Sequence, residues 1–320
     1  MLNRLSITFI LIFLKFWVFA QEGKIRFEHL SSEQGLSQNS VLCILQDQQG
    51  FLWLGTEDGL NKYDGYKFTV YRYEPQDTNS LSDSYITAIC EDHDGNIWIG
   101  TKEGGLNKFN PNTGRIRNWQ HDPENKNSIS SNYILSIYID KADNLWCGTY
   151  GAGLNKFNKN VGTFDCWRSD PDNPSSISND YIYDILEDSQ GNLWLATYYG
   201  LCRMSPEERE SGHFSCYFHD PANAYSISSN QVWSLYETKH PGDTVLWVGT
   251  NSGLNIYQHQ TDRFYRYYPN PQNHEYFNNN INSILLTAAG SKKYLWLGSY
   301  NGLFRVNISE IEGQLPPGEI

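Results

Sequence analysis

Short apolar runs alternate with polar turns along almost the whole chain, and one five-residue pattern recurs at the centre of each unit. The pattern is an aliphatic residue, Trp, another apolar residue, Gly or Ala, and then Thr or Ser. The tryptophans of successive copies lie 45, 48, 48, 53 and 49 residues apart. A period of this size with short strands inside it is typical of a β-propeller or a related array. The six copies begin at Leu52, Ile97, Leu145, Leu193, Leu246 and Leu295.

Each unit contains four candidate strands, which the second unit shows most clearly. Residues 85–90 form the first run, the Trp run follows, and residues 106–109 and 115–119 supply the third and fourth. Gly, Asn and Asp occupy the turns between them, as expected for antiparallel hairpins. Four antiparallel strands make one propeller blade. The Trp run is apolar at successive positions, which predicts a strand buried on both faces.

The count of strands predicts six blades. First strands begin near Val41, Ile86, Ile134, Ile182, Val232 and Ile281. The sixth unit supplies only three strands, whereas residues 24–30 align with the fourth strand of other units. We therefore expect an all-β propeller of six four-stranded blades, closed by residues 25–30 pairing beside residues 303–306. An open or partial seven-bladed propeller is the alternative. The expected domains are the propeller at 21–308 and a tail at 309–320.

The first twenty residues differ from the rest. Arg4 precedes an apolar run that ends in Val18-Phe19-Ala20, which is the pattern of a secretory signal peptide cleaved after Ala20. We expect the mature protein to begin at Gln21 in the periplasm. An uncleaved anchor is the alternative, although Lys15 shortens the apolar run below the length of a membrane-spanning helix.

Charge and cysteine content narrow the possible partners. The net charge is −12, Lys and Arg number 24, and no basic run is present. Binding to nucleic acid or to an anionic membrane is therefore not expected. The six cysteines occupy ordinary strand positions of the repeat, a pattern that favours free thiols. A disulfide between Cys166 and Cys216 is the alternative. No Cys and His spacing suits zinc, and no cofactor is expected.

The unit Glu91-Asp92-His93-Asp94-Gly95-Asn96-Ile97-Trp98-Ile99-Gly100-Thr101 resembles the two-component regulator propeller repeat. The resemblance covers residues 25 to about 308. It implies a periplasmic sensor region of a hybrid two-component system, a family that senses glycan fragments and usually has seven-bladed rings. The chain shows nothing similar to the membrane helix, kinase or DNA-binding parts of those sensors, so kinase activity is not expected. Because seven blades are usual in the family, six blades would fit a truncated or split gene.

Catalytic motifs are not evident. The chain has no Gly-x-Ser-x-Gly elbow, no His-Glu-x-x-His and no P-loop. Residues 92–96 faintly resemble a calcium loop, but a hairpin turn is the favoured interpretation. We expect a sensor-type propeller that binds a glycan or another small molecule and is not an enzyme. A structural or protein-docking propeller is the alternative, and a propeller lyase or glycosidase is the third. The remainder of a split sensor or another periplasmic protein is a candidate partner.

The candidate binding face is derived from strand direction. Loops between second and third strands share one face with the loops that join successive blades. The first residue after the Thr or Ser of each Trp strand is predicted on that face: Glu57, Lys102, Tyr150, Tyr198, Asn251 and Tyr300. The residue leading into each innermost strand is predicted there too: Ser40, Tyr85, Tyr133, Tyr181, Gln231 and Ile281. Flat aromatic rings beside polar side chains suit the C–H faces and hydroxyls of a sugar.

Overall fold

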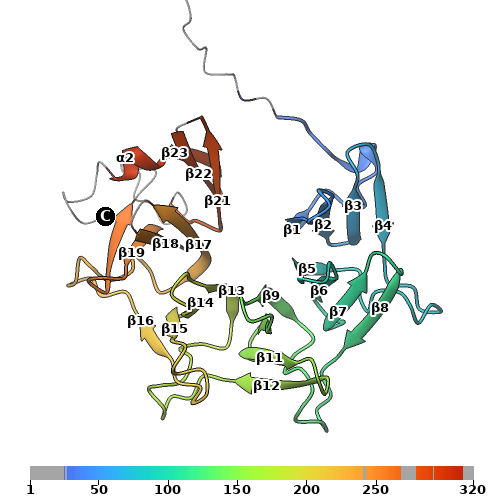
Figure 1. Cartoon of the computed structure of the whole chain (residues 1–320), viewed down its shortest axis with the longest axis horizontal. Coiled ribbons are helices and arrows are strands. Elements are labelled where there is room, and N and C mark those ends of the chain that lie inside the picture. Colours follow the sequence, from blue (N-terminus) through green and yellow to red (C-terminus); the bar gives the residue numbers. More distant parts are fainter. Residues whose placement is uncertain (1–24, 26, 241–242, 268–278, 291, 313–320) are drawn as a thin grey trace, which may run out of the picture.

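The computed structural model describes residues 25, 27–240, 243–267, 279–290 and 292–312. Six antiparallel sheets stand side by side around an arc, and their first strands line its inner side (Figure 1). The inner strands follow one another in chain order, β1, β5, β9, β13, β17 and β21. The predicted all-β propeller of six blades is confirmed.

The strand bounds agree with the predicted units. Blades 1 to 3 contain β1 (Val41–Gln46), β2 (Leu52–Thr56), β3 (Gly59–Tyr63), β4 (Phe68–Tyr71); β5 (Ile86–Glu91), β6 (Ile97–Thr101), β7 (Leu106–Asn110), β8 (Arg115–Trp119); and β9 (Ile134–Ile139), β10 (Leu145–Thr149), β11 (Leu154–Asn158), β12 (Thr163–Trp167). Blades 4 to 6 contain β13 (Ile182–Glu187), β14 (Leu193–Thr197), β15 (Gly200–Met204), β16 (Ser215–Tyr217); β17 (Val232–His240), β18 (Asp243–Thr250), β19 (Gly253–Gln258), β20 (Arg263–Tyr267); and β21 (Ser283–Ala289), β22 (Lys292–Ser299), β23 (Gly302–Asn307). A short helix, α2 (Ile308–Glu312), follows the last strand.

The turn that precedes each of the first four Trp strands is held by one aspartate. In blade 2, Asp92 Oδ1 accepts the N–H groups of Asp94 and Asn96, and Oδ2 accepts the indole N–H of Trp98 at 3.0 Å. Burial opposes ionisation of Asp92, but its hydrogen bonds, among them one from Lys108, outweigh that effect and lower its pKa. Protein donors thus surround the carboxylate, so residues 92–96 are a hairpin turn. The same indole bond joins Trp53 to Asp47, Trp146 to Asp140, and Trp194 to Asp188.

The tryptophans form the contacts between blades. Trp53 of blade 1 packs in a buried cluster with Ile86, Ile97 and Phe109 of blade 2. The glycine of the motif permits this approach, since a Cβ added at Gly55 would lie 2.7 Å from the Ile86 side chain. Trp53, Trp98, Trp146, Trp194 and Trp247 are at most 1% exposed. The core is therefore a row of sheet-to-sheet interfaces.

The predicted closure by the N-terminal strand is wrong. Of residues 25–30, those that the structure describes form no strand, and the sixth sheet has three strands, β21, β22 and β23. Figure 1 shows the arc open between this sheet and blade 1. Ser37, which follows this segment, is tied to Asn61 of blade 1, on the far side of the opening from β23. From the N-terminal segment, Phe27 meets Trp296 of blade 6 edge-on, with ring centroids 6.4 Å apart.

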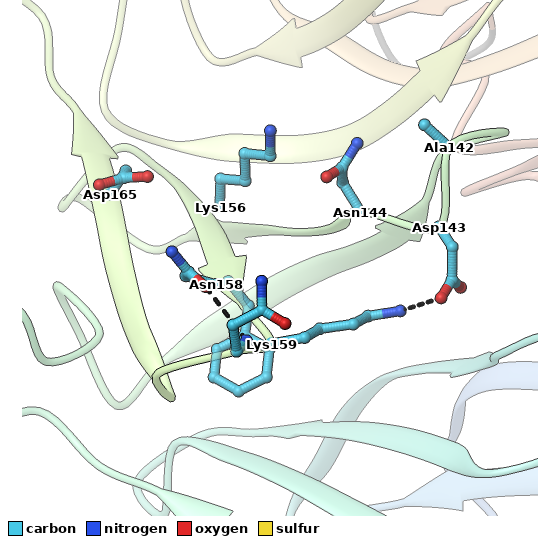
Figure 2. Close-up of a pocket in the computed structure, with 9 residues that line it drawn as sticks. Ala142, Asp143, Asn144, Lys156, Asn158, Lys159 and Asp165 are labelled. Carbon is cyan, nitrogen blue, oxygen red and sulfur yellow. Dashed lines mark hydrogen bonds and ion pairs between the residues drawn. The ribbon is translucent and has the colours of Figure 1, made fainter.

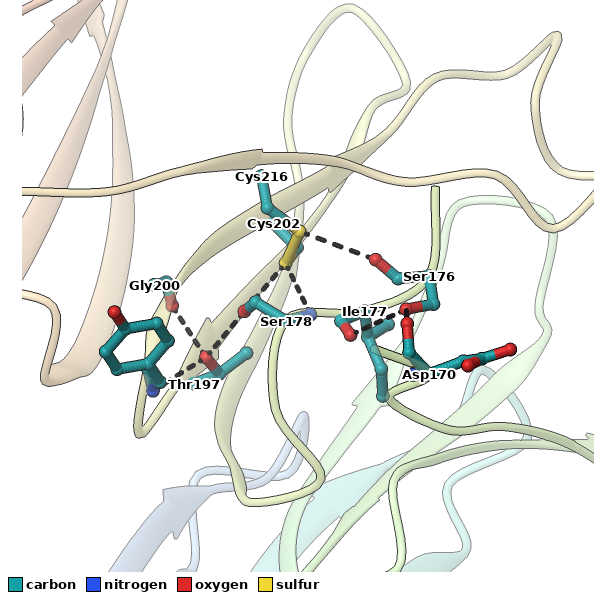
Figure 3. The surroundings of a disulfide bond; sticks show 9 residues. Asp170, Ser176, Ile177, Ser178, Thr197, Gly200, Cys202 and Cys216 are labelled. Atoms are coloured by element: carbon teal, nitrogen blue, oxygen red, sulfur yellow. Dashed lines mark hydrogen bonds between the residues drawn. A yellow bond between two sulfur atoms is a disulfide. The ribbon is translucent and has the colours of Figure 1, made fainter. Parts of the chain in front are cut away.

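The cysteine prediction also needs correction. A disulfide joins Cys202 of β15 to Cys216 of β16, which are direct partners in the strand register (Figure 3). Free thiols were predicted for all six cysteines, and Cys166, the alternative partner considered for Cys216, is free and exposed. The two cysteines that bond are opposite each other within one blade, whereas Cys166 and Cys216 belong to outer strands of different blades, β12 and β16.

Two further predictions concern membrane association. The proposed signal peptide, residues 1–20, lies outside the described residues. Within the part of the chain that the structure describes, no helix has the length and apolar character needed to cross a bilayer.

Candidate binding site

The two predicted sets of residues lie side by side on one face of the arc. In four blades, the residue after the motif Thr donates its backbone N–H to the carbonyl of the residue that leads into the inner strand. The pairs are Lys102 with Tyr85 at 3.1 Å, Tyr150 with Tyr133 at 3.0 Å, Tyr198 with Tyr181 at 3.2 Å, and Asn251 with Gln231 at 3.0 Å. This repeated bond places both side chains at the inner end of each blade.

Blades 1 and 2 contribute polar side chains that interact with one another. The Tyr85 hydroxyl donates to Glu57 Oε1 at 3.3 Å, and the Lys102 ammonium lies 4.7 Å from the centre of the Tyr85 ring. Gln38 also donates to Glu57. These side chains are already engaged with each other, so this end of the face is less available to a ligand.

Blades 3 to 5 contribute a continuous run of aromatic rings. Tyr133 stacks on Tyr150 with centroids 4.8 Å apart, and Tyr150 meets Tyr181 edge-on at 4.6 Å. Tyr181 then contacts Tyr198 at 6.2 Å. Tyr150 and Tyr198 remain 49% and 44% exposed, so both keep ring surface available to a ligand. The structure thus brings together the four predicted tyrosines of blades 3 and 4.

Two further aromatic residues extend this run and were missed in the sequence. Tyr198 contacts Trp233 at 6.3 Å, and Trp233 meets Tyr183 edge-on at 4.6 Å. Both are the unpaired residue of a β-bulge in the inner strand, between Ile182 and Asp184 and between Val232 and Ser234. A bulge re-aims a side chain, which explains why strand alternation did not reveal them. An alignment of the six repeats does single out these two residues, because the residue type at their position differs from one repeat to the next: Leu42, Thr87, Leu135, Tyr183, Trp233 and Asn282.

We call these six side chains the tyrosine arc: Tyr133, Tyr150, Tyr181, Tyr183, Tyr198 and Trp233. Among the described residues, none of the five phenolic hydroxyls of the arc has a hydrogen-bond partner within the protein. Burial raises the pKa of Tyr183 to about 12, and the neighbouring Tyr150 and Tyr198 add to the shift. The pKa of Tyr133 is raised as well, first by burial and then by Tyr150. These phenols therefore stay protonated at neutral pH and serve as neutral donors and acceptors.

A carboxyl group lies next to the arc on the inner strand. Asp184 follows Tyr183, and its carboxylate accepts the backbone N–H groups of Leu235 at 2.8 Å and Ile185 at 2.9 Å. Burial raises the pKa of Asp184 to about 7, although both N–H bonds oppose the shift. The carboxyl group is thus divided between its neutral and ionised forms near neutral pH.

The remaining predicted residues lie toward blades 5 and 6. Asn251 is 5% exposed, and its Nδ2 has no hydrogen-bond partner among the described residues. Tyr300 is 68% exposed and donates its backbone N–H to the side-chain oxygen of Asn280 at 3.1 Å. Ile281 was predicted on the face but is fully buried in the core, because Asn280 occupies the position equivalent to Tyr85. The aromatic part of the face therefore ends at Trp233.

A second repeated feature, a pair of hydrogen bonds between an asparagine and a serine, anchors the loops that lead into the inner strands. In blade 3, Asn155 receives the backbone N–H of Ser130 at 3.0 Å and donates to its hydroxyl at 2.7 Å. In blade 4, Cys202 replaces this asparagine, so the N–H of Ser178 faces the Cys202 sulfur at 3.3 Å instead (Figure 3). The disulfide ties this anchor point to β16. The Asn-to-Ser pair also joins Asn61 to Ser37, Asn107 to Ser82, and Asn255 to Ser228.

A polar hollow of about 380 Å³ on blade 3 is a second candidate (Figure 2). Lys156, Lys159 and Asp143 line it, but Lys159 is paired with Asp143. Lys156 lies 5.3 Å from the Trp146 ring and is the strand partner of Asp165. Because Lys159 and Asp143 already pair with each other, the hollow offers a ligand fewer available charged groups than its lining suggests. Nowhere in the described ranges do three or more His, Cys, Asp or Glu side chains gather as a metal site would need.

The fold defines the class of this protein, an all-β propeller built from Trp-centred repeats. Residues 35–58, 80–103, 128–151 and 176–199 match the model of the two component regulator propeller. Four of the six Trp-centred units therefore resemble this repeat, as their sequences indicate.

Three comparisons describe what the chain resembles. The extracellular domain of the hybrid two component system BT3049 from B. thetaiotaomicron superposes with a TM-score of 0.72 at 26% identity, over 88% of this chain and 36% of that one. PorZ, a surface component of the type-IX secretion system of Porphyromonas gingivalis, has a TM-score of 0.63 at 16% identity, over 86% of this chain and 40% of that one, and shares the fold alone. Histidine kinase P4 of Formosa agariphila is 49% identical over 63 residues, which are 20% of this chain and 5% of that protein. The chain thus spans less than half the length of each of these three proteins.

Proposed function

We propose that this chain is a sensor-type propeller that binds a glycan or a similar small molecule at the tyrosine arc. The observation that carries the proposal is the unbroken series of ring contacts from Tyr133 to Trp233, with exposed ring surface at Tyr150 and Tyr198. Aromatic rings exposed in a group at the inner end of several blades supply apolar faces, and the hydroxyls beside them supply directional contacts.

The proposal assigns binding to the arc without catalysis. The raised pKa values of Tyr133 and Tyr183 keep these phenols neutral, so they are poor nucleophiles and bases. The similarity to the extracellular domain of a hybrid two component system supports a sensor role. The disulfide between Cys202 and Cys216 supports an oxidising, exported location, for which we propose the periplasm.

The test is alanine substitution on both faces of the propeller. A glycan screen first identifies a ligand, and titration calorimetry then measures its Kd. Tyr150→Ala and Tyr198→Ala should each weaken binding by about 1–3 kcal/mol, because each removes a ring face from the arc. Asp94→Ala and Asn112→Ala, exposed on the opposite face, are the matched controls and should leave Kd unchanged. Equal losses from both pairs would remove the arc from consideration.

A protein-docking role is the second candidate, and a different observation favours it. Ile44, Leu285 and Leu303 are between 56% and 65% exposed in the two blades that flank the opening. Apolar side chains grouped in this way are typical of an interaction surface. If docking is the function, substitution of Ile44 and Leu303 by Ser should abolish co-purification of a partner while Tyr150→Ala has no effect.

A further inference from the structure

The tyrosine arc has a distinctive balance of hydrogen-bonding groups. Its five phenols have no protein partners among the described residues, and each can both donate and accept. Trp233 Nε1 and Asn251 Nδ2, at the blade-5 end, are donors that find no acceptor in the described part of the chain. Both nitrogens are shielded from solvent, so the hydrogen-bonding groups that the arc offers to a ligand are its neutral phenols, which suit hydroxyl groups.

The arc also has no cation, in contrast to the neighbouring part of the face. Lys102 lies over the Tyr85 ring, but no described Lys or Arg lies over any ring of the arc. The charged group that adjoins it is Asp184, an acid, and the whole chain carries a net charge of −12. A carboxylate or sulfate brought onto this surface would lose hydration without gaining a countercharge.

We propose that the tyrosine arc selects a neutral saccharide over an acidic one. The phenols of Tyr150, Tyr181 and Tyr198 hydrogen-bond to sugar hydroxyls, and the exposed ring faces stack on sugar C–H groups. This inference rests on the proposed function and adds the chemical class of the ligand. The run of rings crosses three blades, so it suits an oligosaccharide better than a single sugar.

The first experiment is a binding screen with two matched groups of oligosaccharides. One group holds neutral β-1,4-mannan, β-glucan, xylan and galactan oligomers. The other holds acidic β-1,4-mannuronan, galacturonan and chondroitin sulfate oligomers. The expected result is binding to at least one neutral member, at least about tenfold tighter than to any acidic member. The Kd should change little between low and high NaCl, because a neutral ligand has no charge to screen.

The second experiment removes single hydroxyls while keeping the rings. Tyr150→Phe, Tyr181→Phe and Tyr198→Phe should each weaken binding of the neutral ligand about three- to tenfold, the usual effect of one lost hydrogen bond. Tyr66→Phe is the control, since Tyr66 is 94% exposed in the turn between β3 and β4 and away from the arc. Its Kd should match that of the unmodified chain.

The outcomes separate this inference from the proposed function. Tighter and salt-sensitive binding of an acidic oligosaccharide, lost in Tyr150→Ala, would overturn the neutral class and keep the binding face. Unchanged Kd in all three Tyr→Phe variants would overturn the hydrogen-bonding role. No binding by either group, or binding that Tyr150→Ala and Tyr198→Ala leave intact, would overturn the proposed function itself and this inference with it.

Discussion

The interface between blades 4 and 5 and the two faces at the opening of the arc are built from the same repeat, yet they differ in burial. Leu201 is fully buried beside blade 5, whereas the equivalent Leu303 of blade 6 is 56% exposed. Leu235 is 6% exposed on the inner strand of blade 5, beside blade 4, whereas its equivalent Ile44 in blade 1 is 65% exposed. Each repeat therefore presents two apolar faces, whether or not a neighbouring blade covers them.

The motif glycine shows the same contrast at atomic scale. A Cβ at Gly249 would lie 2.6 Å from the Ile281 carbonyl of the next blade. At Gly298, the atoms within reach belong to Ser283 of the same blade. Both blades have the motif glycine, but only the glycine at a packed interface lies close to the backbone of the next blade. The comparison teaches that local sequence specifies how a blade packs but does not specify whether the ring closes.

The largest predicted effect compares two tryptophans. Trp247→Ala should destabilise the protein by about 3–5 kcal/mol, because Trp247 is 1% exposed between blades 5 and 6. Trp296→Ala should cost less than about 1.5 kcal/mol, since Trp296 is only partly buried at the opening. Urea denaturation of both variants measures the difference. Equal losses would show that Trp296 is covered in solution and that the arc closes.

The next prediction concerns the covalent anchor in the packed region. Replacing Cys202 and Cys216 by Ala should cost about 3 kcal/mol, the value expected for a loop of some fifteen residues. The matched variant Cys202→Asn with Cys216→Val reproduces Asn61 and Val70 of blade 1, and should recover about 1–2 kcal/mol by restoring hydrogen bonds to Ser178. If both double variants lose the same free energy of unfolding, the disulfide does not replace the asparagine anchor.

A smaller effect is expected from Asp184 between blades 4 and 5. Its pKa is raised to about 7 in the folded chain and is about 4 when unfolded, so folding favours the protonated form. Its contribution to stability is present below pH 4 and is lost as the pH rises through 7. Asp184→Asn should therefore flatten the fall in melting temperature between pH 4 and 7 and be the more stable form at pH 8. The exposed Asp94→Asn is the control, and an identical pH profile in both variants would contradict the prediction.

The smallest effect is predicted at the opening. Ile44→Lys should change stability by less than about 0.5 kcal/mol, because the side chain is 65% exposed, and it should raise solubility by breaking an apolar surface. Glu33→Gln, which makes the same change of one charge unit, is the control for solubility. A loss of about 2 kcal/mol or more in Ile44→Lys would mean that another blade or chain covers this face.

The candidate site was only partly predictable. Tyr150, Tyr181 and Tyr198 were accessible from the sequence because strand direction alone assigns their loops to one face. Tyr183 and Trp233 were not, because a bulge in the inner strand turns them toward the arc, and a bulge depends on how two strands pair. Ile281 was predicted on the face in error, because the residue that leads into the inner strand of the last unit is Asn280, one position earlier.

By itself, the sequence determined the repeat, the four-strand unit and the burial of the Trp strands, because these follow from local periodicity and turn chemistry. Only the tertiary structure decided the pairing of Cys202 with Cys216, the assembly of the tyrosine arc and the open ends of the ring. Each of these depends on contacts between segments that are distant in the chain.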